Sequence, residues 1–294
     1  RLPSAAPLPT ATPSSPVGWT AEIDPLDYQA RIARLLEYIR AGEIYQANFT
    51  ARHLMPRPPG SAADLYRSLR RSSPAPFAAY LACGPDLAVA SASPERFLSV
   101  DRSGHIETRP IKGTRPRGRD PQEDARLAAE LAASGKDRAE NLMIADLMRN
   151  DIGRVATIGS VAVPSLSAVE TFPAVHHLVS VVEASLRPGA SLIDLLRATF
   201  PGGSITGAPK RRAMALIDEV EVARRGPYCG SIVWLGFDGA MDSSIIIRTL
   251  TITPDLVIAQ AGGGIVFESD PAAEYEEMMV KIRPLLRAID CPSE

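Results

Sequence analysis

Three consecutive β-rich runs toward the C-terminal end restrict the folds that this chain can adopt. Residues 229–237, 243–252 and 256–261 are rich in β-branched and other apolar side chains, and Asp238-Gly239 and Thr253-Pro254-Asp255 separate them. Short turns between such runs are typical of an antiparallel meander, whereas parallel neighbours need a long crossover. Because strands cluster along the chain without βαβ alternation, we expect the α+β class.

Apolar spacing predicts further elements in the rest of the chain. Apolar residues recur at helical intervals between Asp27 and Arg40, and residues 121–132 are rich in helix formers. Ser134 and Asp137 form a capping-box-like pair at the start of another helix. The remaining expectations are a strand at 44–54, a hairpin at 87–108 with its turn at 101–104, and a C-terminal helix from Pro271 with Met278, Ile282, Leu285 and Ile289 on one stripe and a kink or interruption at Pro284.

Length, charge and the lack of long apolar runs narrow the classes of protein to which this chain could belong. The 294 residues are enough to bury a sizeable core, and the formal net charge of -2 gives no electrostatic reason to expect a nucleic acid or an anionic membrane as partner. No apolar run approaches the ~20 residues that span a bilayer, and the first residues lack the apolar core of a signal peptide, so we expect a cytoplasmic protein. Residues 1–20 are expected to be a Pro-, Ala- and Ser-rich linker or a truncated stub, and residues 21–294 one domain.

Lysine is scarce in this chain. Of 32 basic residues only four are lysines: Lys112, Lys136, Lys210 and Lys281. Arginine keeps its charge in proteins, whereas a desolvated lysine can lose its proton and become a nucleophile. The scarcity shows no role by itself, but it selects four positions at which to look for one.

Two pairs of acidic residues lie on predicted helices. Asp137 and Glu140 are three positions apart, as are Glu274 and Glu277, so the members of each pair share a helix face. Both pairs border apolar stripes, where a carboxylate is costly unless it is paired or bound to a cation. Oxygen-only ligands suit Mg²⁺ better than zinc. The alternative for each pair is an ordinary solvated helix face.

Other segments offer groups that bind anions. The Gly-rich segment 201–210 enters a helix, whose first N–H groups attract anions. Arg248 interrupts an apolar β-rich run, and its guanidinium is matched by a carboxylate of a substrate or of the protein itself. His176 and His177 are adjacent in an extended segment, so at most one of them faces a site. Each feature alone is also explained by a tight turn, a structural ion pair or a core histidine.

Taken in order, these segments resemble the chorismate-utilising enzymes, the family of the anthranilate, aminodeoxychorismate, isochorismate and salicylate synthases. The resemblance extends from about residue 22 to residue 290. The segments that carry it are Ile44–Asn48, Ser93–Phe97, Pro110–Thr114, Ala139–Ile144, Arg149–Asp151, His177–Ser180, Pro201–Lys210, Tyr228, Arg248, Ala261–Val266 and Glu274–Lys281.

The resemblance implies one chorismate-binding catalytic domain over residues 21–294, similar to anthranilate synthase component I, with β-sheets packed face to face and helices outside. It also implies a magnesium site of Glu140 and Glu277, supported by Asp137 and Glu274, with Glu95 as the general acid at the C4 hydroxyl. The implied substrate-binding residues are Thr114, Thr206, Tyr228, Arg248, Gly262, Gly263, Gly264 and Lys281, with His177 beside them.

Two positions distinguish branches of this family. Hydroxylating members are similar but have a lysine where Gln46 stands, and anthranilate synthases have alanine in place of Lys112, whereas aminodeoxychorismate synthases have the Pro-Ile-Lys-Gly-Thr form found here. The resemblance therefore implies that Lys112 adds at C2 of chorismate and that ammonia from a glutamine amidotransferase subunit or fused domain then replaces it at C4. The product, 4-amino-4-deoxychorismate, leads to 4-aminobenzoate and folate.

The implied reaction requires the neutral amine of Lys112. A lysine amine is protonated in water at pH 7, so Lys112 is expected to be desolvated or near a cation such as Arg109, Arg115 or Mg²⁺. The alternatives that stay open are an anthranilate synthase, with amination at C2 and release of pyruvate, and a relative that binds chorismate without turnover.

Overall fold

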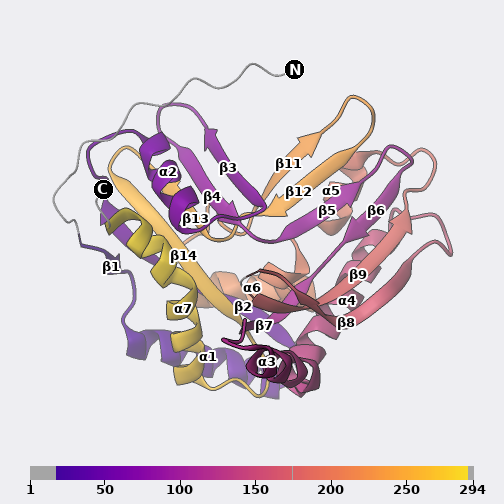
Figure 1. The fold of residues 1–294 in the computed structure, drawn as a ribbon, viewed down its shortest axis with the longest axis horizontal. Helices are drawn as coiled ribbons and strands as arrows, with labels where there is room; N and C mark the ends of the chain where they lie inside the picture. The colour runs from indigo at the N-terminus through magenta and orange to yellow at the C-terminus, as the bar shows by residue number, and fades with distance from the viewer. Residues whose placement is uncertain (1–17, 174, 291–294) are drawn as a thin grey trace.

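A computed structural model describes residues 18–173 and 175–290, and it contains two antiparallel sheets with helices on their outer sides (Figure 1). The first sheet has the order β1 (Thr20–Ala21), β2 (Gln46–Pro56), β14 (Leu256–Ile265), β13 (Thr249–Ile252), β4 (Ala88–Ser93) and β3 (Phe77–Ala82), with β10 (Gly207–Ala208) also paired to β2. The second has the order β11 (Ser231–Leu235), β12 (Met241–Ile245), β5 (Arg96–Val100), β6 (His105–Thr108), β9 (Val175–Ser185) and β7 (Ile111–Pro116), with β8 (Ala162–Thr171) also paired to β9. This confirms the α+β class.

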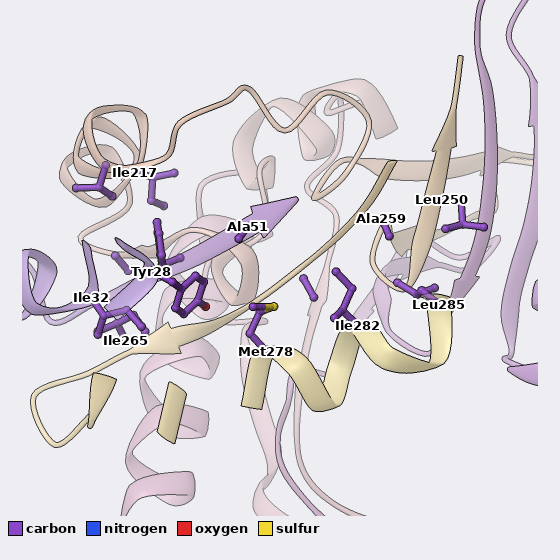
Figure 2. Packing of buried hydrophobic residues seen from close by; sticks show 14 of the residues in the cluster. Tyr28, Ile32, Ala51, Ile217, Leu250, Ala259, Ile265, Met278, Ile282 and Leu285 are labelled. Atoms are coloured by element: carbon purple, nitrogen blue, oxygen red, sulfur yellow. The ribbon is translucent and has the colours of Figure 1, made fainter. Parts of the chain in front are cut away.

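Each sheet has its own hydrophobic core. Helices α1 (Pro25–Arg40), α2 (Ala62–Ser72), α6 (Lys210–Val220) and α7 (Pro271–Asp290) pack on the first sheet. Figure 2 shows Met278, Ile282 and Leu285 of α7 pointing toward the strands, as the apolar stripe predicted. On β2 the alternate residues Phe49 and Ala51 join this core, so the residues between them face away from the helices.

Three other helices pack on the second sheet or on one another beside it. They are α3 (Pro121–Ala133), α4 (Gly135–Gly153) and α5 (Leu192–Thr199), and the 3₁₀ helix η1 (Gly203–Ile205) follows α5. Ile144, Met148 and Ile152 of α4 are buried with Leu98 and Ile106 of the sheet. Because the helices occupy the outer sides, the ends of β2, β14 and β7 are left to form the site described below.

The helix predictions are confirmed with small changes of boundary. Helices α1, α3 and α7 cover the predicted ranges. The expected interruption at Pro284 is wrong, since α7 continues through this residue to Asp290. Ser134 caps α4 by accepting a hydrogen bond from the backbone of Asp137, but the Asp137 carboxylate pairs with Arg115 instead of completing a capping box. Among the described residues, no helix is long and apolar enough to cross a membrane.

Two predicted β segments are divided between the sheets, and this corrects the sequence analysis. In the run 243–252, β12 belongs to the second sheet and β13 to the first, and Arg248 lies between them with a left-handed φ of 52°. In the segment 87–108, β4 and β5 are likewise in different sheets, so the hairpin is confined to β5 and β6. Alternating hydrophobicity identifies a strand but not the sheet that it joins. The greater part of the expected linker, residues 1–17, lies outside the described residues.

Candidate active site

Lys112 lies on β7 beside a break in the strand ladder. It is the register partner of Leu178 on β9, and a bulge at Gly113 follows before Thr114 pairs with His177. Gly113 has a φ of 74°, and a Cβ there would lie 2.8 Å from Cγ of Asp137, so a glycine is required. The Lys112 side chain is 14% exposed, and its Nζ lies 3.8 Å from Oε2 of Glu140. The lysine is thus largely desolvated, as expected.

Gln46 and Gly264 bring the first sheet up to this lysine. The Gln46 side chain is fully buried, and neither its Oε1 nor its Nε2 has a hydrogen-bond partner within the described part of the chain. A Cβ on Gly264 would lie 2.2 Å from Nε2 of Gln46 and 3.4 Å from Nζ of Lys112. A buried amide without partners is costly, so this arrangement favours a ligand that would bond to Gln46.

Three glutamates form an acidic cluster next to Lys112, and three lysines balance it. A Cβ on Gly263 would lie 3.0 Å from Oε2 of Glu274 and 3.6 Å from Oε1 of Glu277. The ion pairs are Lys112 with Glu140, Lys136 with Glu274 at 3.2 Å, and Lys281 with Glu277 at 2.7 Å. Ser269 also donates to Glu274, and Lys281 donates to the carbonyl of Gly262. Glu140 of the first predicted acidic pair therefore lies near Glu274 and Glu277 of the second, although they are far apart in sequence.

The pKa of Glu140 and the pKa of Glu277 are shifted in opposite directions. Burial raises the pKa of Glu140, the charges of Glu277 and Glu274 add to the rise, and those of Lys112 and Lys136 oppose it. Burial would also raise the pKa of Glu277, but the adjacent Lys281, helped by Lys136 and Lys112, holds it below its usual value. Three mutually repelling carboxylates with oxygen-only donors have the chemistry of a divalent-cation site.

The predicted metal ligands do not all converge. Asp137 pairs with Arg115 at 3.4 Å, and within residues 18–173 and 175–290 no three acidic, histidine or cysteine side chains are arranged as a preformed metal site. The cations expected beside Lys112 are also engaged elsewhere, since Arg109 pairs with Glu107 and Glu170. The neighbour of Lys112 is therefore an anion, Glu140, and not an arginine.

Glu95 lies between β4 and β5, where the chain passes from one sheet to the other. Burial raises the pKa of its carboxyl, although the charge of Lys112, a hydrogen bond with Ser204 and the charge of Lys281 oppose the rise. A carboxyl with a raised pKa stays protonated closer to neutral pH, as a general acid requires. Ser204 was not singled out by the sequence, because its contact with Glu95 depends on the position of η1.

Tyr228 is buried and Arg248 is half-buried, and the two lie close enough for each to influence the pKa of the other. Burial lowers the pKa of Arg248, and Tyr228 opposes this; Arg248 also donates to the carbonyl of Lys281. No carboxylate of the described residues forms an ion pair with Arg248. Burial raises the pKa of Tyr228, which keeps its hydroxyl protonated and able to donate. A substrate carboxylate would supply the missing partner.

The remaining predicted residues lie around this centre. Thr206 and Tyr228 line a cavity of about 550 Å³ that also borders α6 and residues 221–230 but does not include Lys112 or Glu140. Oγ1 of Thr114 and Nδ1 of His177 are 2.9 Å apart, and burial lowers the pKa of His177. Lys136 was noted in the sequence as a scarce lysine, but its partner Glu274 could not be read from spacing.

Comparisons with known proteins identify the family and the fold. The model of a family described as "chorismate binding enzyme" matches residues 2–287. "Aminodeoxychorismate synthase component 1" of Salmonella typhimurium is 50% identical over 283 residues, which are 96% of this chain and 62% of the relative, and "Anthranilate synthase component 1" of Streptomyces coelicolor is 44% identical over 292 residues, 97% of this chain and 56% of the relative. The crystal structure of anthranilate synthase component I from Streptococcus pneumoniae has a TM-score of 0.85 at 36% identity and covers 96% of this chain and 63% of its own.

The chain spans less than two thirds of the length of these relatives. The family match nevertheless extends over nearly all of the chain, and the likeness in fold extends equally far. The protein belongs to the chorismate binding enzyme family.

Proposed function

We propose that this protein converts chorismate and ammonia into 4-amino-4-deoxychorismate. The observation that carries the proposal is the position of Lys112, whose amine lies 3.8 Å from the carboxylate of Glu140 and beside Gly264, as does the amide of Gln46, which has no hydrogen-bond partner among the described residues. Gln46 cannot act as a base toward water, which disfavours hydroxylation. Three relatives named aminodeoxychorismate synthase component 1 are 50–51% identical to this chain, whereas three relatives named anthranilate synthase component 1 are 44–47% identical to it.

In the proposed reaction Lys112 is the nucleophile and Glu95 the acid. The neutral amine of Lys112 forms a bond to C2, and both ring double bonds shift, from C1=C2 to C1=C6 and from C5=C6 to C4=C5. The C4–O bond breaks in the same step, and the hydroxyl leaves as water with a proton from Glu95. Ammonia then forms a bond to C4, both double bonds shift back, and Lys112 departs from C2 as the neutral amine. The new C4 ammonium group returns a proton to Glu95. Chorismate and ammonia thus give 4-amino-4-deoxychorismate and water.

Other residues would bind the substrate. Arg248 and Tyr228 would hold the enolpyruvyl carboxylate, and the remaining anion-binding positions are Thr114, Thr206, Gly262, Gly263, Gly264 and Lys281, with His177 beside them. Glu140 and Glu277 would hold Mg²⁺ with Glu274 and Asp137 in support, and the ion would supply positive charge for the ring carboxylate. The words "component 1" in the relatives' names support a second component, which we propose is a glutamine amidotransferase that delivers ammonia. A role in 4-aminobenzoate and folate synthesis and a cytoplasmic location stay predictions.

A product assay tests the proposal. The purified protein is incubated with chorismate, Mg²⁺ and ammonium, with and without aminodeoxychorismate lyase, and 4-aminobenzoate is expected only when the lyase is present. Fluorescent anthranilate without lyase would contradict C4 amination, and binding of chorismate without any product would favour the non-catalytic alternative. Both Lys112→Ala and Lys112→Arg should abolish C4 amination, because arginine retains its charge.

A further inference from the structure

Asn141 follows Glu140 in the sequence of α4, and its side chain is fully buried. Its Nδ2 donates to the carbonyl of Pro110 at 3.1 Å and to that of Leu178 at 3.3 Å. Its Oδ1 accepts from Oγ of Ser167 at 3.1 Å and from Oγ of Ser180. Both donors and both acceptor positions of the amide are therefore used inside the protein.

These bonds join the helix that carries Glu140 to the segment that leads into β7, the strand of Lys112, and to the neighbouring strand β9. Pro110 is two residues before Lys112, and Leu178 is the register partner of Lys112 on β9. The backbone N–H of Ser180 donates to the same Pro110 carbonyl, at 3.2 Å. Asn141 is thus the point at which α4, the start of β7 and the middle of β9 are tied together.

The chain on the other side of Lys112 is less constrained by the ladder. The register shifts between Lys112 and Thr114, and Gly113 occupies the bulge. A lysine amine stands on a flexible four-carbon stem, so its position depends on how firmly its backbone is held. The anchor at Pro110 and Leu178 is therefore what fixes the base of this stem.

We infer that Asn141 is a positioning residue: it fixes the position of the Lys112 amine relative to the Glu140 carboxylate and to Gln46 and Gly264 of the first sheet. The inference rests on the proposed function, because it assigns Asn141 to the lysine step of that reaction. Asn141 has no capacity left to bind substrate, so its effect is exerted through the backbone of Pro110 and Leu178. A displacement of about 1 Å at a reacting group costs about 100-fold in rate.

The test measures the lysine step directly. Chorismate is mixed with excess protein and Mg²⁺ without ammonium, the reaction is quenched at successive times, and the mass of the Lys112 peptide gives the rate of adduct formation. The variants are Asn141→Ala and Ser180→Ala. The second removes one donor to Oδ1 of Asn141 and the acceptor of the Ser167 backbone N–H, and it preserves the Pro110 bond from Nδ2. Asn150→Ala is the matched control, because Asn150 is an exposed asparagine near the end of the same helix.

The expected result is adduct formation about 100-fold slower in Asn141→Ala and about 10-fold slower in Ser180→Ala, with Asn150→Ala unchanged. The Kd of chorismate should stay within about threefold of the wild-type value in all variants, because a positioning residue changes the rate of adduct formation and not the affinity for chorismate. Equal adduct rates in wild type and both network variants would overturn the inference, as would a loss of chorismate binding that accounts for the slower rates. If Asn141→Ala does not fold, Ser180→Ala decides the outcome. If the wild type forms no adduct, the proposed lysine chemistry has failed instead.

Discussion

Adding a single methyl group at Gly264 should separate the catalytic arrangement from the stability of the fold. The neighbouring glycines of β14 meet different atoms, which makes a matched series. A Cβ at Gly264 would lie 2.2 Å from Nε2 of Gln46, whereas a Cβ at Gly262 would lie 1.9 Å from the backbone oxygen of Phe49. At Gly263 it would lie 3.0 Å from Oε2 of Glu274.

The expected magnitudes follow from what must move at each position. In Gly264→Ala the buried amide of Gln46 has to shift by roughly 1 Å to regain van der Waals distance, at a cost of about 1–3 kcal/mol and a fall in Tm of about 2–5 °C. The same shift next to Lys112 should lower kcat by about 100-fold. In Gly262→Ala the contact is with backbone, so β2 and β14 must separate and the fall in Tm should exceed about 5 °C.

Thermal denaturation and steady-state C4 amination measure the two effects on the same preparations. Gly264→Ala should remain folded with a much reduced kcat, Gly262→Ala should lose mainly stability, and Gly263→Ala should weaken binding of Mg²⁺, measured by calorimetry. The reasoning would be refuted if Gly264→Ala kept kcat within about threefold of wild type while Tm fell as expected. In that case the Gln46 amide and the Lys112 amine would not act together.

Three further substitutions test the charges of the site. Burial and acidic neighbours raise the pKa of Glu140, so its destabilising effect is absent at low pH and grows as pH rises through that pKa; Glu140→Gln should therefore raise Tm more at about pH 8 than at about pH 5, by calorimetry. Arg248→Lys should raise KM for chorismate by about 10–100-fold with a smaller change in kcat, because the planar contact with a carboxylate is lost. Lys210→Met leaves the buried Asp151 carboxylate without its partner and should lower the free energy of unfolding by about 3–5 kcal/mol in urea titration.

Sequence periodicity predicted most elements because it reports which side of an element is buried. Helices α1, α3 and α7 follow from apolar residues at helical spacing. What periodicity could not predict is the change of sheet within the run that contains Arg248. Pairing of β13 with β14 and of β12 with β5 depends on contacts distant in sequence, and an alternating pattern is compatible with either sheet.

The same limit applies to the site. The motifs identified Lys112, Glu140, Glu274 and Glu277 as candidates, but the partner of each was not predictable, because Lys136 and Glu274 are 138 positions apart. Asp137 had the same helical spacing as the other acidic residues and yet pairs with Arg115. Spacing on one helix fixes a shared face, while the second helix and the strand that meet that face depend on the complete fold.

The scarcity of lysine acquires a meaning from these contacts. Each of the four lysines pairs with a glutamate or an aspartate. Three of these pairs form one cluster: Lys112 with Glu140, Lys136 with Glu274, and Lys281 with Glu277. The fourth pair, Lys210 with Asp151, lies outside this cluster. An ammonium held by a carboxylate is not a nucleophile, since nucleophilic attack needs the neutral amine. The contact between Lys112 and Glu140 therefore belongs to the protein without bound substrate. Under the proposed mechanism, substrate binding has to draw Glu140 away from Lys112 before the amine can reach C2.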